Sequence, residues 1–140
     1  MKALTISQPF ATLIATGEKW VENRTWETLY TGWLAIHAGK GTQYLDRDEL
    51  QAYPTGCIIA VARIVACVHI DAIHDSCQRD DIVLGTRRTW QEIATHEHTE
   101  GPWCWVLQDV RTVDHVPING MQGLWRVPDE IVAKLKGGAP

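Results

Sequence analysis

The longest apolar segment, Cys57 to Ile70, constrains the fold more than any other part of the chain. It reads CIIAVARIVACVHI and is rich in β-branched residues. Such a run favours a long strand with both faces buried, and a strand of this kind usually crosses the centre of a barrel or sheet. Arg63, in the middle of the run, would then have to reach a carboxylate such as Glu22, or solvent.

Chain length predicts one domain. The 140 residues suit a single hydrophobic core. We expect this domain to extend over residues 1–136, with a frayed tail at 137–140. No apolar run reaches the roughly 20 residues of a membrane helix. The amino terminus also lacks the apolar stretch of a signal peptide, so we expect a cytoplasmic protein that makes no membrane contact.

Charge and cysteine usage narrow the possible functions. The net charge is −4, with 13 basic and 17 acidic residues. This balance does not suit a protein that coats duplex nucleic acid, although it permits a local basic pocket. The four cysteines form no Cys-x-x-Cys pair, which argues against a zinc site. We therefore expect neither a metal nor another cofactor.

The order of predicted elements indicates a mostly β fold with short helices (α+β). Apolar alternation and turn residues predict a small barrel with helices at its mouth. The expected strands cover residues 2–7, 20–26, 33–37, 57–70, 103–113, 115–118 and 124–127. The expected helices lie near residues 10–16, 42–52, 90–94 and 128–136. Ser7 is expected to cap the first helix, and Gly17 to end it.

The segment 17–26 carries the most unusual polar pattern. In a strand, Trp20, Glu22, Arg24 and Trp26 would share one face. Since burial of an unpaired charge is costly, Glu22 and Arg24 must pair, face a polar cavity or reach solvent. Lys19 could bring its ammonium to the same place. The pattern fits a site for a planar, anionic ligand. It also fits a structural salt bridge within a Trp-rich barrel wall, which the spacing alone slightly favours.

Three further residues are candidates for ligand contact. Gln8 stands at a junction between a strand and a helix, where backbone donors point outward. His37 ends a predicted strand, and Lys40 lies between two glycines that would let the backbone approach a phosphate. Structural roles compete with these functions, because Gln8 can cap a helix and His37 can be a hydrogen-bonded core histidine.

The pattern Gly17-x-Lys19-x-x-Glu22-x-Arg24 resembles the signature of the ASCH domain (activating signal cointegrator homology). The resemblance implies a PUA-like pseudo-β-barrel. It also implies a cleft between the first helix and the barrel that holds RNA, DNA or a modified nucleoside. Further stretches that resemble family landmarks are residues 8–11, 25–26, 30–32, 36–40, 54–57 and 123–125.

Some members of the wider family are amidohydrolases that deacetylate N4-acetylcytidine, and another relative is described as a ribonuclease. The amidohydrolases use the signature lysine, which corresponds to Lys19. They carry a threonine at the position that Glu22 occupies in this chain. The resemblance therefore makes Lys19 a catalytic candidate. Glu22 departs from the amidohydrolase pattern and is a candidate for a metal-independent hydrolase through its own carboxylate chemistry.

Three functions remain open at the level of sequence. The first is binding of single-stranded RNA or a modified nucleoside in a basic, Trp-lined cleft, where base stacking contributes ~1–3 kcal/mol per base. The second is hydrolysis, with Glu22 as general base and Lys19 stabilising a developing oxyanion. The third is a protein-interaction domain without a nucleotide ligand. We prefer binding to hydrolysis, since Arg24 should engage Glu22 and make it a weak base. We expect the protein to be a monomer. The binding candidates are Gln8, Lys19, Arg24, Trp26, His37 and Lys40.

Overall fold

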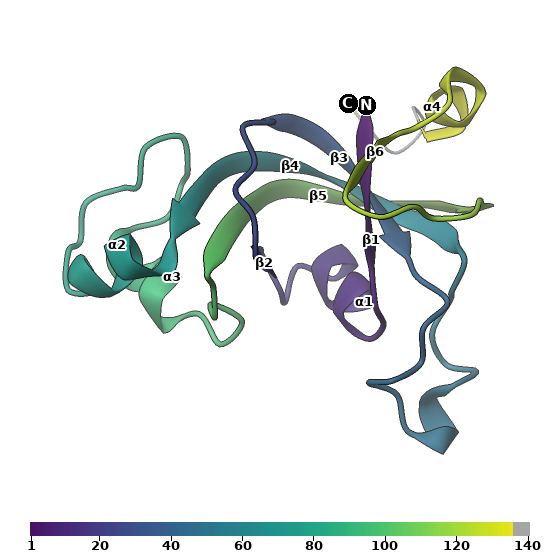
Figure 1. Ribbon diagram of the computed structural model, residues 1–140, viewed down its shortest axis with the longest axis horizontal. Helices are drawn as coiled ribbons and strands as arrows, with labels where there is room; N and C mark the ends of the chain where they lie inside the picture. The colour runs from purple at the N-terminus through teal and green to yellow at the C-terminus, as the bar shows by residue number, and fades with distance from the viewer. Residues whose placement is uncertain (136–140) are drawn as a thin grey trace. The chain divides into compact units, whose positions relative to one another are not determined.

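The computed structural model describes residues 1–135 and shows a mostly β chain with short helices (Figure 1), as predicted. The tail predicted at 137–140 lies outside the described residues. The elements in chain order are β1 (Lys2–Ile6), α1 (Phe10–Ala15), β2 (Val21–Arg24), β3 (Gly32–Ala38), the 3₁₀ turn η1 (Arg47–Glu49), β4 (Cys57–His69), α2 (Ile70–Asp75), α3 (Trp90–Thr95), β5 (Trp103–Pro117), β6 (Leu124–Arg126) and α4 (Asp129–Leu135).

The strands form one sheet in the order β2-β5-β4-β3-β1-β6. β1 runs parallel to β3 and antiparallel to β6, whereas β2 runs antiparallel to β5. The chain divides into two compact units, and β4 and β5 contribute residues to both. The first unit contains Met1–Lys19, Trp33–Ala62 and the chain from Asp109 onward. The second contains Trp20–Gly32 and Arg63–Gln108.

Cross-strand register explains the core of the first unit. Ala3 pairs with Ala35 on one side and with Trp125 on the other. Paired residues point to the same face of a sheet, so the two alanines leave room for the indole. All three side chains are buried. They pack with Ile58, Val61, Val116, Val127 and Leu135.

The first helix, α1, begins differently from the prediction. Ser7 does not cap it with its side chain. Instead, Gln8 Oε1 accepts a hydrogen bond of 2.9 Å from the Thr12 amide. The carboxamide thus satisfies a helix-start donor that the predicted serine would have taken. Gly17, with φ of 86°, ends the helix as expected.

The strand β4 confirms the long strand predicted from the sequence. Its first residues, Cys57 to Ala62, are buried, whereas Arg63 is exposed. Arg63 is thus accessible to solvent, which is one of the two outcomes expected for this position. Burial on both faces explains why the first half of the strand carries apolar side chains at consecutive positions.

The second unit has its own apolar core. Val21 of β2 pairs with Val106 of β5, and both are fully buried. The helices α2 and α3 lie side by side in this unit (Figure 1). α3 starts with a capping box, in which Thr89 Oγ1 accepts from the Glu92 amide and Glu92 accepts from the Thr89 amide. The other buried core residues are Ile73, Val83, Ile93 and Cys104.

Four predicted elements differ from the structure. The strands expected at 103–113 and 115–118 form one continuous β5, with Asp109 at φ of 53° inside it. Aspartate tolerates this left-handed conformation, and Pro117 stands at the strand end, where no ladder donor is needed. The helix expected at 42–52 is only η1, since Asp46 and Glu49 cap a single turn. β2 is shorter than predicted and excludes Trp20 and Trp26.

None of the helices in the described part of the chain is long and apolar enough to cross a membrane.

Candidate functional site

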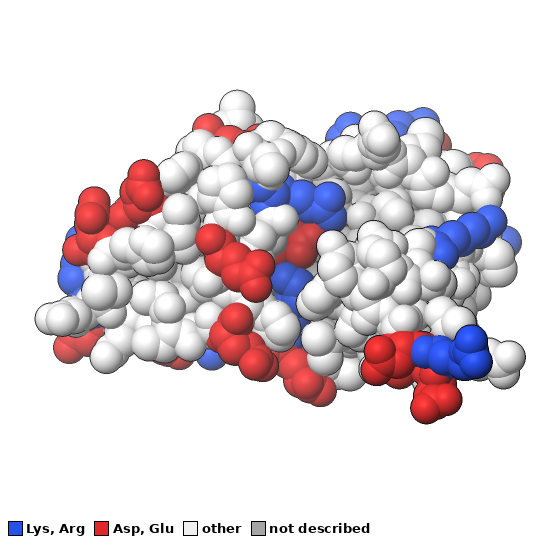
Figure 2. Space-filling view, turned by 60° about the horizontal axis from the view of Figure 1, so that its bottom comes forward, with Lys and Arg blue, Asp and Glu red and all other residues white. Residues whose placement is uncertain are grey.

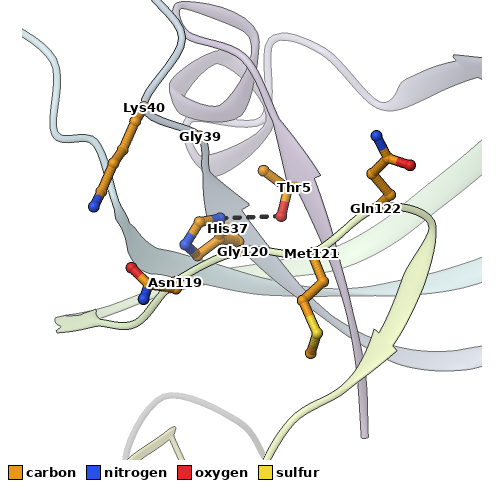
Figure 3. Close-up of a pocket in the computed structure, with 8 residues that line it drawn as sticks. All are labelled: Thr5, His37, Gly39, Lys40, Asn119, Gly120, Met121 and Gln122. Carbon is orange, nitrogen blue, oxygen red and sulfur yellow. Dashed lines mark hydrogen bonds between the residues drawn. The ribbon is translucent and has the colours of Figure 1, made fainter.

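A cavity of about 440 Å³ lies in the first unit (Figure 3). Two of its lining residues, His37 and Lys40, are candidates predicted from the sequence. We call this site the Lys40 cavity. Its volume is within the range of roughly 300–1,000 Å³ that is typical of small-molecule sites. The residues that line it are Thr5, His37, Gly39, Lys40, Asn119, Gly120, Met121 and Gln122.

The parallel pairing of β1 with β3 positions His37. Thr5 and His37 are register partners, and Thr5 Oγ1 lies 3.2 Å from His37 Nδ1. His37 Nε2 lies 2.7 Å from the carbonyl oxygen of Ile118. Because a carbonyl can only accept, Nε2 carries the proton and Nδ1 accepts from the Thr5 hydroxyl. Trp125 Nε1 in turn donates to Thr5 Oγ1 over 3.2 Å.

Burial keeps the imidazole of His37 neutral. The side chain is 2% exposed. Desolvation lowers the pKa of His37 below its ordinary value, the Ile118 carbonyl raises it, and the positive charge of Lys40 lowers it. With both ring nitrogens bonded to the protein, His37 acts as a rigid support for the cavity.

Gly120 brings the backbone directly onto this support. A Cβ atom at position 120 would lie 2.5 Å from Thr5 Oγ1 and 2.8 Å from His37 Cε1. Both distances are too short for any side chain, so only glycine fits here. The close approach places the neighbouring Asn119 and Met121 on either side of the covered histidine (Figure 3).

Lys40 supplies the positive charge of the cavity. Lys40 is exposed to solvent. Its aliphatic stem passes close to Gly56, where a Cβ atom would lie 2.9 Å from Lys40 Cε. Figure 3 shows Lys40 and Asn119 on one side of the His37–Thr5 pair and Gln122 on the other. An ammonium and two carboxamides therefore surround a floor of neutral groups.

The signature pair of the second unit forms a close ion pair. Arg24 Nη2 and Nε lie 2.7 and 3.0 Å from the same oxygen of Glu22, Oε2. Glu22 is 6% exposed. The two charges thus satisfy each other, which is the structural alternative anticipated for this face.

Trp26 is partly exposed and contacts another indole. It is 37% exposed, and its ring meets that of Trp105 edge-on at 4.8 Å and 81°. Trp105 is the register partner of Glu22 and is fully buried. Trp26 therefore lies on the same side of the sheet as Glu22, as the sequence pattern predicts.

Gln8 and Lys19 lie in the first unit but do not line the cavity. Gln8 is 0% exposed, and its Nε2 donates to the Pro54 carbonyl over 2.8 Å while Oε1 caps α1. Lys19 is 4% exposed, and its amide donates to the Leu13 carbonyl. The Gln8 carboxamide thus holds local structure in place.

The basic and aromatic cluster at 86–90 also serves the fold. Arg88 lies over the Trp20 ring at 4.2 Å and pairs with Glu92 at 3.4 Å. Arg79 lies over the Trp90 ring at 5.5 Å. These cation–π contacts hold the two guanidinium groups against the indoles.

Sequence reasoning missed Thr5, Asn119, Met121 and Gln122 as lining residues. Residues 119–123 contain two glycines and stand between two predicted strands, but the sequence does not show which strand this segment meets. Alternation along β1 places Thr5 on the face opposite to Leu4 and Ile6. This alternation was the sequence signal that could have identified Thr5 as a lining residue. Within residues 1–135, no group of three or more His, Cys, Asp or Glu side chains could hold a metal ion.

The visible surface carries mixed charge. The face drawn in Figure 2 shows acidic and basic side chains interspersed, rather than a continuous basic surface. This agrees with the net charge of −4. On this face, a favourable field for an anion is therefore local.

The family model of the ASCH domain matches residues 4–116, and the chain belongs to this family. Human activating signal cointegrator 1 is 25% identical to this chain over an alignment of 153 positions, gaps included. The alignment covers 96% of this chain. The chain spans about a quarter of that relative, or 24% of its length.

Solved structures support the fold. The crystal structure of ASCH from Zymomonas mobilis has a TM-score of 0.59 at 19% identity, with 97% of this chain and 93% of that chain covered. A tyrosine-to-phenylalanine variant of that protein scores 0.59 at 19% identity, with 97% and 96% covered. A serine-to-alanine variant scores 0.58 at 20% identity, with 97% and 94% covered.

Proposed function

We propose that this chain binds single-stranded RNA or a modified nucleoside in the Lys40 cavity. The observation that carries the proposal is the position of Lys40 beside a buried, neutral His37 in a cavity of about 440 Å³. Membership of the ASCH family supports it, because these domains resemble RNA-binding PUA folds.

The chemistry of the lining supports a nucleotide ligand. Asn119 and Gln122 carry carboxamides, which both donate and accept hydrogen bonds and can read the polar edge of a base. Lys40 offers three donors and a positive charge to a phosphate. An unpaired base suits such a cavity better than a duplex does, because its edges and faces are accessible.

The site differs from the predicted Trp-lined cleft, because only His37 and Lys40 of the six predicted binding residues line it. Its lining within the described chain includes Met121 but no indole, and Trp125 contributes through its hydrogen bond to Thr5. Met121 is 57% exposed, and its flexible thioether can pack against an aromatic ring. We therefore assign the apolar contact with a base to Met121.

The hydrolase alternative has less support. Glu22 Oε2 already accepts two hydrogen bonds from Arg24, and an oxygen held in this way is poorly suited to remove a proton from water. The pair fits a structural role in the second unit. We infer that binding, rather than hydrolysis, is the principal activity.

Replacement of Lys40 by alanine tests the proposal. Lys40→Ala should weaken binding to a short single-stranded RNA about tenfold or more, which corresponds to loss of one charge-assisted contact of ~1.5–3 kcal/mol. The measurement is fluorescence anisotropy at fixed salt. Lys134→Ala is the matched control, because Lys134 is exposed in α4 and does not line the cavity. Equal affinities for the two variants would refute the assignment.

A further inference from the structure

The described lining of the Lys40 cavity contains a lysine but no aspartate or glutamate. Among its described lining residues, Lys40 is the single charged side chain, whereas the chain as a whole has a net charge of −4. The other polar side chains that line it are neutral. His37 is neutral as well, because burial lowers its pKa. The cavity is thus a local site for an anion on an acidic protein.

We propose that the Lys40 cavity binds the terminal phosphate of a single nucleotide, either a free nucleoside monophosphate or the phosphorylated end of an RNA. This inference rests on the proposed function and narrows it to one class of ligand. It distinguishes a terminal phosphate from the phosphodiesters inside an RNA chain.

The charge of the ligand favours a terminal phosphate. A phosphomonoester carries about −1.5 to −2 near pH 7, whereas a phosphodiester carries about −1. A lone ammonium without neighbouring cations gains most from the more highly charged group. A protein that follows the backbone of a longer RNA would instead need several cations in a row, and the residues that line this cavity supply only Lys40.

The backbone around Lys40 is suited to close approach. Gly39 precedes Lys40, and Gly120 packs directly against Thr5 and His37 in the cavity lining. Main chain that borders a cavity without a side chain of its own can bring its polar groups near a phosphate oxygen. Asn119, on the same side as Lys40 in Figure 3, adds a carboxamide donor. A phosphate at this end would meet one ammonium and one amide.

The remaining space fits one nucleoside. A cavity of about 440 Å³ is at the lower end of the range for small ligands, which suits a mononucleotide. Gln122 and Met121 lie away from Lys40, with a carboxamide for a base edge and a thioether for its face (Figure 3). The arrangement thus orients the ligand with its phosphate toward Lys40.

His37 provides a reporter for phosphate binding. The charge of Lys40 is one of the causes that lower the pKa of His37. A bound phosphate would offset that charge and shift the pKa of His37 upward. A nucleoside without phosphate, bound in the same cavity, would not produce this electrostatic effect.

The test compares ligands that differ only in the terminal phosphate. The four ribonucleosides, their 5′-monophosphates and inorganic phosphate are titrated into the purified chain by calorimetry. A six-nucleotide RNA is measured with either a 5′-phosphate or a 5′-hydroxyl. NMR follows the His37 ring protons as a function of pH, with and without ligand. The variants are Lys40→Ala and, as control, Lys134→Ala.

We expect at least one monophosphate to bind tenfold or more tightly than its nucleoside and to raise the pKa of His37. This advantage should disappear in Lys40→Ala and persist in Lys134→Ala. If the phosphorylated RNA gains tenfold over the hydroxyl RNA, the ligand is an RNA end; if only free monophosphates gain, it is a free nucleotide.

Other outcomes separate this inference from the function on which it rests. Equal affinity for nucleoside and monophosphate, together with equal affinity for the two RNAs, would overturn the inference and leave nucleoside or RNA binding in place. Inorganic phosphate that binds as tightly as every monophosphate would also overturn it. No binding of any nucleoside, nucleotide or RNA would overturn both. Should Lys40→Ala fail to fold, the wild-type His37 titration still decides.

Discussion

His37 has both ring nitrogens bonded within the protein, so its protonation state is defined by its neighbours. The Ile118 carbonyl requires a proton on Nε2, and the Thr5 hydroxyl donates to Nδ1. A second proton would have to enter a desolvated site beside Lys40. The residue therefore stabilises the fold only in its neutral form.

This protonation state predicts a pH dependence of stability. The pKa of His37 is lowered from 6.5 in the folded chain. Below about pH 6.5 the unfolded chain binds a proton that the folded chain resists, so the free energy of unfolding should fall as the pH decreases from neutrality toward the lowered pKa. Urea denaturation between pH 5 and about 7.5 measures the effect.

The variant His37→Gln should reduce this slope, because glutamine can still donate to the Ile118 carbonyl but does not titrate. His115→Gln serves as control, since His115 is exposed in β5. A slope that is the same in wild type and His37→Gln would contradict the role assigned to His37.

At the scale of elements, Asn23 connects β2 to the segment that leads into β5. Its Nδ2 donates to the His98 carbonyl over 2.7 Å. Its Oδ1 accepts from the amides of Glu100 and Gly101 over 2.9 and 2.8 Å. One side chain thus satisfies three backbone groups of an irregular segment, all within the second unit.

Loss of these bonds should be costly. Asn23→Ala is expected to lower the free energy of unfolding by roughly 2–3 kcal/mol, since three backbone groups lose their partner. Hydrogen exchange at Glu100 and Gly101 should accelerate more than in the α1 helix. Asn119→Ala, a change of the same type at an exposed position, should cost less than about 0.5 kcal/mol. Unchanged exchange at Glu100 and Gly101 would argue against the connection.

At the scale of the whole molecule, an acidic chain that binds nucleic acid through the Lys40 cavity should do so with a weak dependence on salt. Each phosphate neutralised on a single strand changes the slope of log K against log salt by about −0.7. The chain has a net charge of −4, and Lys40 is the cation of the described cavity lining.

We therefore expect a slope of about −0.7 to −1.4 for a short single-stranded RNA, measured by anisotropy between roughly 50 and 200 mM salt. The slope of Lys40→Ala should approach zero, whereas that of Lys134→Ala should match wild type. A slope steeper than about −3 would mean that several cations contact the RNA and that the Lys40 cavity is not the principal site.

The residues that sequence reasoning placed correctly are those whose role depends on local pattern. Glu22 and Arg24 are two apart in one strand, so their side chains share a face and pair. Gly17 ends α1 because its position requires a positive φ. The buried run of β4 followed from its β-branched residues.

The residues that it placed incompletely depend on partners distant in the chain. The Thr5–His37 bond joins β1 to β3, and Gly120 meets both side chains from the segment before β6. Ser7 was expected to cap α1, but Gln8 reached the helix start instead and bonded to Pro54 as well. Such contacts depend on register and chain path, which periodicity alone does not specify.

The sequence by itself determined that the chain is an ASCH domain of mostly β structure, because strand periodicity and the signature residues are local properties. Only the tertiary structure decided which polar residues share a cavity. His37 and Lys40 meet Asn119 and Gln122 there because parallel pairing of β1 and β3 aligns Thr5 with His37, and because a glycine at 120 lets a distant segment close over them.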